Sequence, residues 1–201
     1  MIGEENFLFR KKKALEKLDY AIIEDKVDIG IKPILGLINK NKEYYTSSSC
    51  YGRILLLEIP NIGNKKEAKF LGKWHRSIEL IELINALKKA KKGQIWLLSQ
   101  SPIIHIISKN YKSADVLLKI AISCGFKNSG IKSLGQKIVV EICSTERLDA
   151  PLGENGIVFC DIDYIRLLIN ISNEIMEKSA NKLNKLKSKF KKDLYTYKTT
   201  I

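Results

Sequence analysis

The segment from Asp161 to Lys192 repeats apolar residues at helical spacing and constrains the fold more than any other part of the chain. The apolar positions share one side of a helix and are Ile165, Leu168, Ile175, Leu183, Leu186 and Phe190. With the standard rise per residue, this helix would be about 45 Å long. A single domain does not need that length, so we expect its end to project or to lie along the surface.

The opposite edge of this helix carries lysines at steps of four and three residues: Lys178, Lys182, Lys185, Lys189 and Lys192. The chain has 35 Lys and Arg against 22 Asp and Glu, a net charge of +13, which favours a polyanionic partner such as nucleic acid. We expect Lys182, Lys185 and Lys189 to contact an RNA backbone. A solvated helix face, or the lysine content of a chain from a hot habitat, explains the same pattern.

Alternating stretches between turn residues predict strands in the middle of the chain, and helical spacing predicts four shorter helices. The expected strands are 45–47, 53–59, 69–74, 95–98, 103–107 and 137–142, with an extended piece at 148–152. The expected helices are 5–24, one capped by Asp28 and ending near 39, one capped by Ser77 and ending near 93, and one capped by Ser113 and stopped by Gly125.

This order of elements predicts an α+β fold with a mixed, largely antiparallel sheet of about six or seven strands flanked by helices. We expect a single domain with N-terminal helices in 1–42, a strand-rich core in 43–160 and the long basic helix in 161–192. The chain contains no GxGxxG after a first strand and no Walker loop, so a doubly wound nucleotide-binding fold of the Rossmann or P-loop type is not expected.

Cysteine spacing and hydropathy predict where the protein works. Cys50, Cys124, Cys143 and Cys160 are far apart and form no CxxC pair, so we expect reduced thiols, no metal site and a cytoplasmic protein. No apolar stretch approaches the length of a membrane span. The zinc-protease HExxH and serine-hydrolase GxSxG signatures are absent from the sequence.

Polar clusters occur at the ends of several predicted strands. The first is Ser47 to Arg53, where hydroxyls, Gly52 and the Arg53 guanidinium suit a phosphate or carboxylate, although a polar hairpin turn has the same composition. The second is Gly125 to Ile131, which suits a planar base or simply connects a helix to a strand. The third is Ser144 to Arg147. Clusters at several strand ends are what one shared pocket would produce.

The two histidines, His75 and His105, both lie in apolar strand segments. A histidine in such a place is more often a hydrogen-bonded core or edge residue than a catalyst. Both interpretations stay open at this point.

Taken together, these clusters resemble the wybutosine-synthesis methyltransferases, the tRNA wybutosine-synthesizing protein 3 family, in an archaeal-type form. The resemblance spans nearly the whole chain. Its motifs are SSCYGRI at 48–54 against the family's SSCSGRI, PIIHI at 102–106, GFKNSGI at 125–131 against GFRNSGI, ST at 144–145, APL at 150–152 and YIRLL at 164–168. Tyr51 replaces a small residue, and Cys143 stands where an arginine is frequent.

The resemblance implies methyl transfer from S-adenosylmethionine to a ring nitrogen of the tricyclic wyosine-type base beside the anticodon of phenylalanine tRNA. Such a transfer is an in-line displacement, so the enzyme must align nitrogen, methyl carbon and sulfur and accept a proton where one is lost. The main alternative is a non-enzymatic tRNA-binding or RNA-binding protein.

On this basis the expected site has three groups of residues. His105 or His75 would position the base or accept its proton as the catalytic group. Ser48, Ser49, Gly52 and Arg53 would bind the cofactor carboxylate or an RNA phosphate. The substrate would contact Asn128, Ser129, Gly130, Ser144 and Thr145, with Lys182, Lys185 and Lys189 along the tRNA backbone.

Overall fold

The computed structural model describes residues 4–64 and 66–196, with side chains up to Lys192. The chain forms two compact units, and each takes segments from separate parts of the sequence. The first unit comprises Met1–Tyr51, Pro102–Thr145 and Ala180–Ile201, and the second comprises Gly52–Ser101 and Glu146–Ser179. The connections between strands, and the last helix, carry the chain from one unit to the other.

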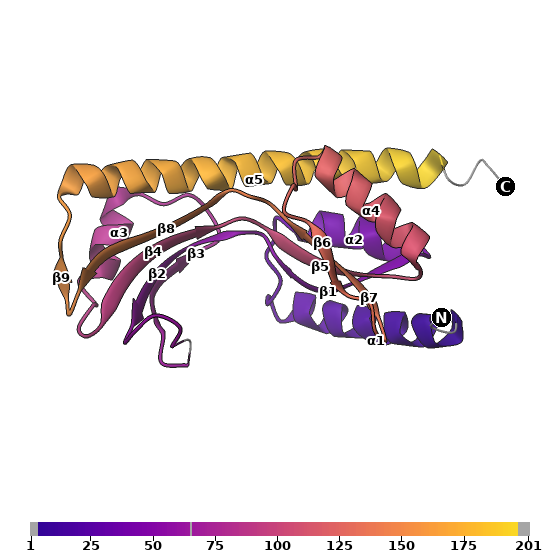
Figure 1. The fold of residues 1–201 in the computed structure, drawn as a ribbon, viewed down its shortest axis with the longest axis horizontal. Helices are drawn as coiled ribbons and strands as arrows, with labels where there is room; N and C mark the ends of the chain where they lie inside the picture. The colour runs from indigo at the N-terminus through magenta and orange to yellow at the C-terminus, as the bar shows by residue number, and fades with distance from the viewer. Residues whose placement is uncertain (1–3, 65, 197–201) are drawn as a thin grey trace. The chain divides into compact units, whose positions relative to one another are not determined.

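Two helices begin the described chain, strands and single helices follow, and the long α5 ends it (Figure 1). The helices are α1 (Glu4–Ile23), α2 (Lys32–Lys40), α3 (Leu80–Leu87), α4 (Tyr111–Ser123) and α5 (Ile162–Thr196). The strands are β1 (Tyr44–Cys50), β2 (Arg53–Ile59), β3 (Lys69–Trp74), β4 (Gln94–Gln100), β5 (Ile103–Ser108), β6 (Gly130–Ser133), β7 (Ile138–Cys143), β8 (Arg147–Glu154) and β9 (Ile157–Val158).

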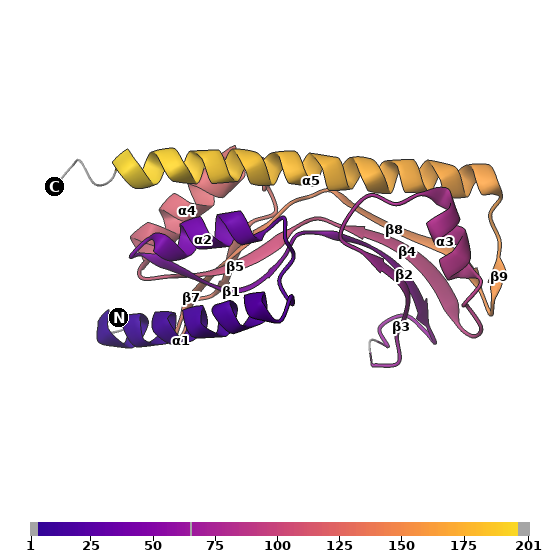
Figure 2. The same cartoon turned by 180° about the vertical axis from the view of Figure 1, so that it is seen from behind.

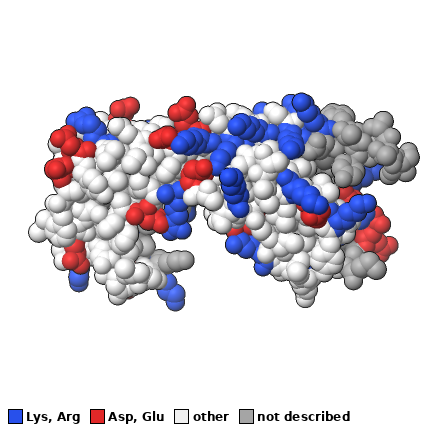
Figure 3. All heavy atoms as spheres, turned by 45° about the horizontal axis from the view of Figure 1, so that its top comes forward, with Lys and Arg blue, Asp and Glu red and all other residues white. Residues whose placement is uncertain are grey.

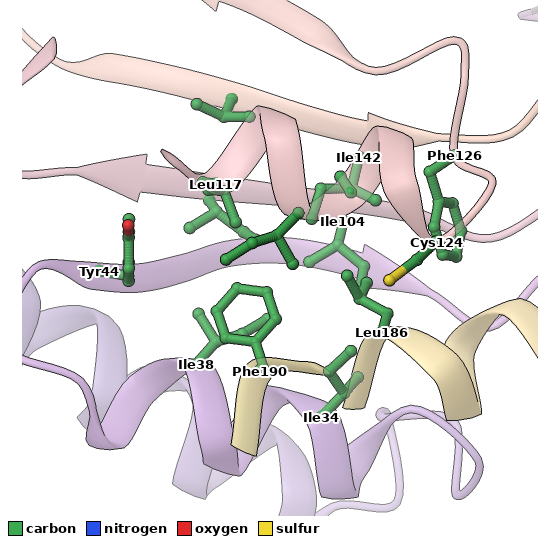
Figure 4. Close-up of a cluster of buried hydrophobic side chains, with 14 of the residues drawn as sticks. Ile34, Ile38, Tyr44, Ile104, Leu117, Cys124, Phe126, Ile142, Leu186 and Phe190 are labelled. Atoms are coloured by element: carbon green, nitrogen blue, oxygen red, sulfur yellow. The ribbon is translucent and has the colours of Figure 1, made fainter. Parts of the chain in front are cut away.

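The first unit is built on a four-stranded antiparallel sheet with the order β1-β5-β7-β6. Helix α1 lies on one face of this sheet, and α2, α4 and the end of α5 lie on the other (Figure 1). The second face carries the larger core, which includes Ile34 and Ile38 from α2, Leu117 from α4, and Leu186 and Phe190 from α5 (Figure 4). The end of α5 is therefore a structural part of the first unit.

Two aromatic contacts fasten the helices to this sheet. Tyr44 meets Phe190 edge to face, with ring centroids 6.3 Å apart, and its hydroxyl donates to the Ser113 carbonyl at 2.8 Å. On the other face Phe7 of α1 packs on Tyr45 at 5.2 Å, with Ile107 beside them. Consecutive residues of β1 thus face opposite layers, as the pleat of a strand requires.

The second unit is a five-stranded antiparallel sheet with the order β3-β2-β4-β8-β9. Helix α3 lies beside the first half of α5, as seen from both sides in Figures 1 and 2. The side-chain amide of Asn173 in α5 bonds both the N–H and the carbonyl of Ile78, just before α3, at 2.9 Å. Buried residues from α5 in this unit include Ile165, Leu168 and Met176.

The predicted start of α5 is correct, and three predicted helix caps are wrong. Asp161 accepts from the Tyr164 N–H at 2.8 Å and begins α5 as expected. Ser77 does not cap α3, which starts after Glu79, and Asn110 rather than Ser113 caps α4. Asp28 does not cap α2, because its carboxylate accepts from the Tyr51 N–H at 2.8 Å. Asp28 therefore holds the end of the SSSCYG segment.

Helix α3 also ends earlier than predicted, at Leu87. The backbone N–H groups of Lys91 and Lys92 turn to donate to the buried carboxylate of Glu58, so residues after the helix serve as its hydrogen-bond donors. Burial of a carboxylate requires such partners. Helical spacing in the sequence does not reveal that these N–H groups bond Glu58 instead of continuing the helix.

The α+β class and the long C-terminal helix are confirmed, and the strands 53–59 and 69–74 have the predicted bounds. The prediction of one mixed sheet is wrong, because the described strands form two sheets and all their pairings are antiparallel. Strands β6 and β9 were not predicted. The division of a single domain at residues 42/43 and 160/161 stays a prediction. Among the described helices, none is long and apolar enough to cross a membrane.

Phe190→Ala tests the structural role of the end of α5. Phe190 is 1% exposed and fills the space between α2 and β1. Its truncation should lower the free energy of unfolding by about 3–5 kcal/mol. Lys191→Ala, on the exposed side of the same turn, should change it by less than about 0.5 kcal/mol in the same guanidinium titration. Equal values for both variants would contradict this packing.

Candidate active site

A row of polar side chains crosses the first sheet on the face opposite its main core. Ser48 of β1 pairs in register with His105 of β5, which pairs with Glu141 of β7. Ser48 Oγ lies 2.8 Å from His105 Nδ1, and His105 Nε2 lies 2.8 Å from Glu141 Oε2. Lys132 of β6 completes the row, with its Nζ 2.8 Å from Glu141 Oε1. Four adjacent strands each contribute one member.

A β-bulge in β1 puts Ser48 into this row. The register of β1 on β5 shifts between Thr46 and Ser48. Thr46 faces α2, where its N–H donates to the Asn39 Oδ1 at 2.8 Å, and simple alternation would then place Ser47 opposite His105. The extra residue moves Ser48 into that place instead.

The electrostatics of the row keep Glu141 ionised. Burial opposes ionisation of its carboxyl, but the hydrogen bonds from Lys132 and His105 hold the pKa of Glu141 below its ordinary value. The same ion pair raises the pKa of Lys132. An ionised carboxylate only accepts hydrogen bonds, so the neutral imidazole carries its proton on Nε2 and presents Nδ1 as an acceptor to the Ser48 hydroxyl.

This arrangement can accept a proton at the sheet surface. His105 is partly exposed, with 31% of its side chain accessible, and Glu141 stabilises the imidazolium that protonation of Nδ1 would form. His105 is thus a hydrogen-bonded residue on the exposed face of the sheet, and its catalytic role stays a prediction.

The sequence motifs of the first unit meet at one end of its sheet. Cys50 at the end of β1 pairs with Ile103 at the start of β5, which pairs with Cys143 at the end of β7. The Ser129 hydroxyl, just before β6, accepts from the Cys143 N–H at 3.1 Å and donates to the Phe126 carbonyl at 2.7 Å. The TSSSC, PIIH, KNSG and ICST segments thus lie at one end of this sheet, and a pocket shared by them stays a prediction.

Several residues expected to bind substrate also hold this end together. Ser144 is buried and accepts from the Lys182 Nζ at 2.7 Å, and Lys182 packs against Gly125. Lys189 donates to the Ser123 hydroxyl at 2.6 Å. Asn128, Thr145 and Lys185 are exposed, and Gly130 pairs in register with Glu141. Their contact with a substrate stays a prediction.

The C-terminal part of α5 forms a groove with the end of α4 that contains three of the five lysines of the expected basic edge. Its volume is about 790 Å³, and Lys185, Lys189 and Lys192 line it together with Ser123. Figure 3 shows Lys and Arg side chains gathered over this part of α5, while Asp and Glu accompany them over its start. We call this the α5 groove.

Within the second unit, Gly52, Arg53 and His75 lie near one end of its sheet. Gly52 has φ +99°, in the left-handed region that favours glycine, and its carbonyl accepts from His75 Nδ1 at 3.0 Å. Arg53 pairs in register with Gln100 and donates from Nε to its Oε1 at 2.9 Å. Neither terminal nitrogen of Arg53 has a hydrogen-bond partner among the described residues, so this fork is available for a carboxylate or phosphate.

Sequence reasoning missed three members of these arrangements: Glu141, Lys132 and Gln100. Glu141 had a signal, since it is the one charged residue within the apolar strand Ile138–Cys143. Gln100 and Lys132 had none, because their roles depend on which strands are neighbours.

The family model for the methyltransferase TYW3 matches residues 9–192, nearly the whole chain. The chain belongs to this family. The predicted resemblance and the prediction of a methyltransferase enzyme are therefore confirmed.

Curated relatives cover nearly the whole length as well. A Pyrococcus horikoshii protein is 46% identical over 186 residues, which is 92% of this chain and 95% of the relative. A Methanocaldococcus jannaschii protein is 44% identical over 190 residues, 90% of this chain and 98% of the relative. Both are named tRNA(Phe) 7-((3-amino-3-carboxypropyl)-4-demethylwyosine(37)-N(4))-methyltransferase.

Solved structures share the fold of this TYW3 family member. One from Pyrococcus horikoshii has a TM-score of 0.92 and 46% identity, covering 94% of this chain and 98% of the other. A hypothetical protein from Aeropyrum pernix has a TM-score of 0.72 and 28% identity, covering 82% and 98%. The expectation of a fold other than the Rossmann type is confirmed.

The pH dependence of stability tests the Glu141 ion pair. Because the folded-state pKa of Glu141 is lowered, its contribution is present above the unfolded value and is lost as pH falls through the folded value. Glu141→Gln should lower stability at pH 7 by roughly 1–2 kcal/mol, and this difference should shrink as pH falls below the unfolded-state value of about 4.3. Unfolding titrations at several pH values measure it, with the exposed Glu16→Gln as control. A gap that is constant with pH would contradict the ion pair.

Proposed function

We propose that this protein transfers a methyl group from S-adenosylmethionine to N4 of the 7-(3-amino-3-carboxypropyl)-4-demethylwyosine base at position 37 of tRNA(Phe). The near full-length similarity to relatives named for this reaction carries the proposal. The predicted tRNA partner, the anticodon-loop location and the cytoplasmic setting belong to the same proposal.

The chain's own residues supply the parts that this reaction needs. S-adenosylmethionine, when bound, supplies an electrophilic methyl group on a sulfonium, and the pair of electrons in the breaking carbon–sulfur bond stays on sulfur. His105 would accept the proton that the base nitrogen loses, with Glu141 holding the imidazole and stabilising its charge. The Arg53 fork has the geometry to bind the methionine carboxylate. Ser48, Ser49 and Gly52 remain proposed partners of the cofactor or an RNA phosphate.

Alanine substitutions test which of the two histidines, His105 or His75, accepts the proton. His105→Ala should lower the maximal methylation rate roughly 100-fold, because a positioned base contributes at least that much. Glu141→Gln should also lower this rate, since the His105 imidazole loses the carboxylate that orients it. Mass spectrometry of nucleosides from methylated tRNA measures both. If His75→Ala lost methylation activity while His105→Ala kept full activity, His75 and not His105 would be the proton acceptor.

Arg53→Ala should raise the KM for S-adenosylmethionine on the order of tenfold to a hundredfold, since hydrogen bonds to charged groups contribute about 1.5–3 kcal/mol. Arg147 is the matched control, because it lies at the same end of the same sheet but its guanidinium already pairs with Asp149. Arg147→Ala should leave this KM within about twofold. A rise in the KM for tRNA instead would place an RNA phosphate on Arg53.

The overall proposal is tested by incubating the protein with S-adenosylmethionine and tRNA(Phe) that carries the demethylated base. One methyl group on the tricyclic base is the expected product. Tight tRNA binding with no transfer, and no effect of S-adenosylmethionine on that binding, would favour the non-enzymatic RNA-binding alternative.

A further inference from the structure

A second basic groove lies on the opposite face of the first sheet, between α1 and β1. Its volume is about 490 Å³. Basic residues from three segments line it, namely Arg10, Lys13, Lys17, Lys26 and Lys137, and no Asp or Glu is among its lining residues. We call this the α1 groove.

Apolar contacts hold α1 on the sheet beside the α1 groove. Phe7 and Ala14 contact Tyr45 and Ile107 there. The apolar lining of the groove comprises Ala14, Leu18, Ala21, Val27 and Leu35, of which Leu18, Val27 and Leu35 also pack in the main core. An apolar floor beneath a basic rim excludes water and strengthens the attraction of the rim for an anion.

Most of the rim is not neutralised by the protein. Lys13, Lys17 and Lys137 have no acidic partner among the described residues, and Lys13 Nζ lies 4.5 Å from the centroid of the Phe9 ring. Lys26 pairs with Glu24, and Arg10 donates to the Gln136 carbonyl at 2.8 Å. The α5 groove differs in this respect, since Lys189 there already donates to Ser123.

One buried polar group in the α1 groove lacks a partner. Tyr45 lines the groove and is 2% exposed, and its hydroxyl has no hydrogen-bond partner among the described residues. Burial raises the pKa of this phenol, and the charge of Arg10 acts against the rise. An unpaired buried hydroxyl is unfavourable, so an acceptor oxygen bound beside Arg10 would satisfy it.

The hydroxyl-rich strand joins the α1 groove to the catalytic row. Ser47, Ser48 and Ser49 line the groove, and Ser48 Oγ bonds His105. A chain of phosphates lying on the rim would therefore pass directly beside the proposed proton acceptor. Single-stranded RNA has phosphates spaced along an accessible backbone and 2′-hydroxyls able to bond serine side chains.

We infer that the α1 groove binds the phosphate backbone of a single-stranded RNA segment next to the reacting nucleotide. This inference rests on the proposed function and adds to it the surface that presents the RNA. The α5 groove lies on the other side of the sheet, beyond the core, and cannot place RNA beside His105.

Charge reversal tests the inference on the full chain. Lys17→Glu with Lys137→Glu should weaken binding of tRNA(Phe) about tenfold, which corresponds to about 1.4 kcal/mol. The slope of log affinity against log salt should fall by about 1.4, because each lost phosphate contact on a single strand removes about 0.7. S-adenosylmethionine affinity, measured by calorimetry, should not change. Filter binding over a series of salt concentrations measures the tRNA affinity and its salt dependence.

Two matched variants make the result decisive. Lys112→Glu with Lys191→Glu changes the net charge equally at exposed positions outside both grooves and should leave affinity within about twofold. Lys185→Glu with Lys189→Glu alters the α5 groove. An equal loss of tRNA affinity in the outside variant would mean that net charge alone causes the effect. A loss of affinity only in the α5 variant would mean that the RNA binds in the α5 groove. Either outcome overturns the inference.

Failure of the proposed function would look different. If the wild-type protein bound tRNA through the α1 groove but transferred no methyl group, the inference about the groove would be supported and the proposed reaction would be refuted. If the variant with Lys17→Glu and Lys137→Glu methylated tRNA with an unchanged KM for tRNA, the proposed reaction would be supported and the inference about the α1 groove would be refuted. Circular dichroism of each variant confirms that it is folded.

Discussion

The antiparallel register of β1, β5 and β7 is the constraint on which the first unit and its candidate site depend. Ile104 and Ile106 are completely buried on one face of β5, so His105 between them lies on the other. A shift of one residue would expose both isoleucines and bury the imidazole. Full burial of an isoleucine is worth about 1.5–3 kcal/mol, so the core opposes that shift strongly. Hydrophobic packing on one face thereby holds a polar row on the opposite face.

The bulge at Ser47 lets the two halves of β1 bond different partners. Its first half must match α2, where Thr46 bonds Asn39, and its second half must match β5, where Ser48 bonds His105. A regular strand would satisfy only one of them. The end of the strand is fixed again by Asp28, which accepts from the Tyr51 N–H. Secondary structure around the motif is therefore determined by side-chain partners from other elements.

The positive charge of the chain is divided between surfaces of different character. On α5, Lys182 and Lys189 donate to serines of the first unit, so part of the basic edge stabilises the fold. On α1 and before β7, Lys17 and Lys137 face a groove without acidic neighbours. A net charge of +13 predicts a polyanionic partner but does not distinguish these surfaces.

Local patterns in the sequence determined most helices and strands, the long amphipathic α5 and the motifs that place the chain in the TYW3 family. These features depend on neighbouring residues, on apolar periodicity and on turn residues, all of which are visible in one dimension. The tertiary structure alone decided that the strands form two sheets, and that Glu141 and Lys132 join Ser48 and His105 in one row. It also showed that Asp28 holds Tyr51 instead of capping a helix. Strand pairing brings together residues that are far apart in the chain, and the free energy that selects one pairing comes from burial on both faces of the sheet, which no local pattern contains.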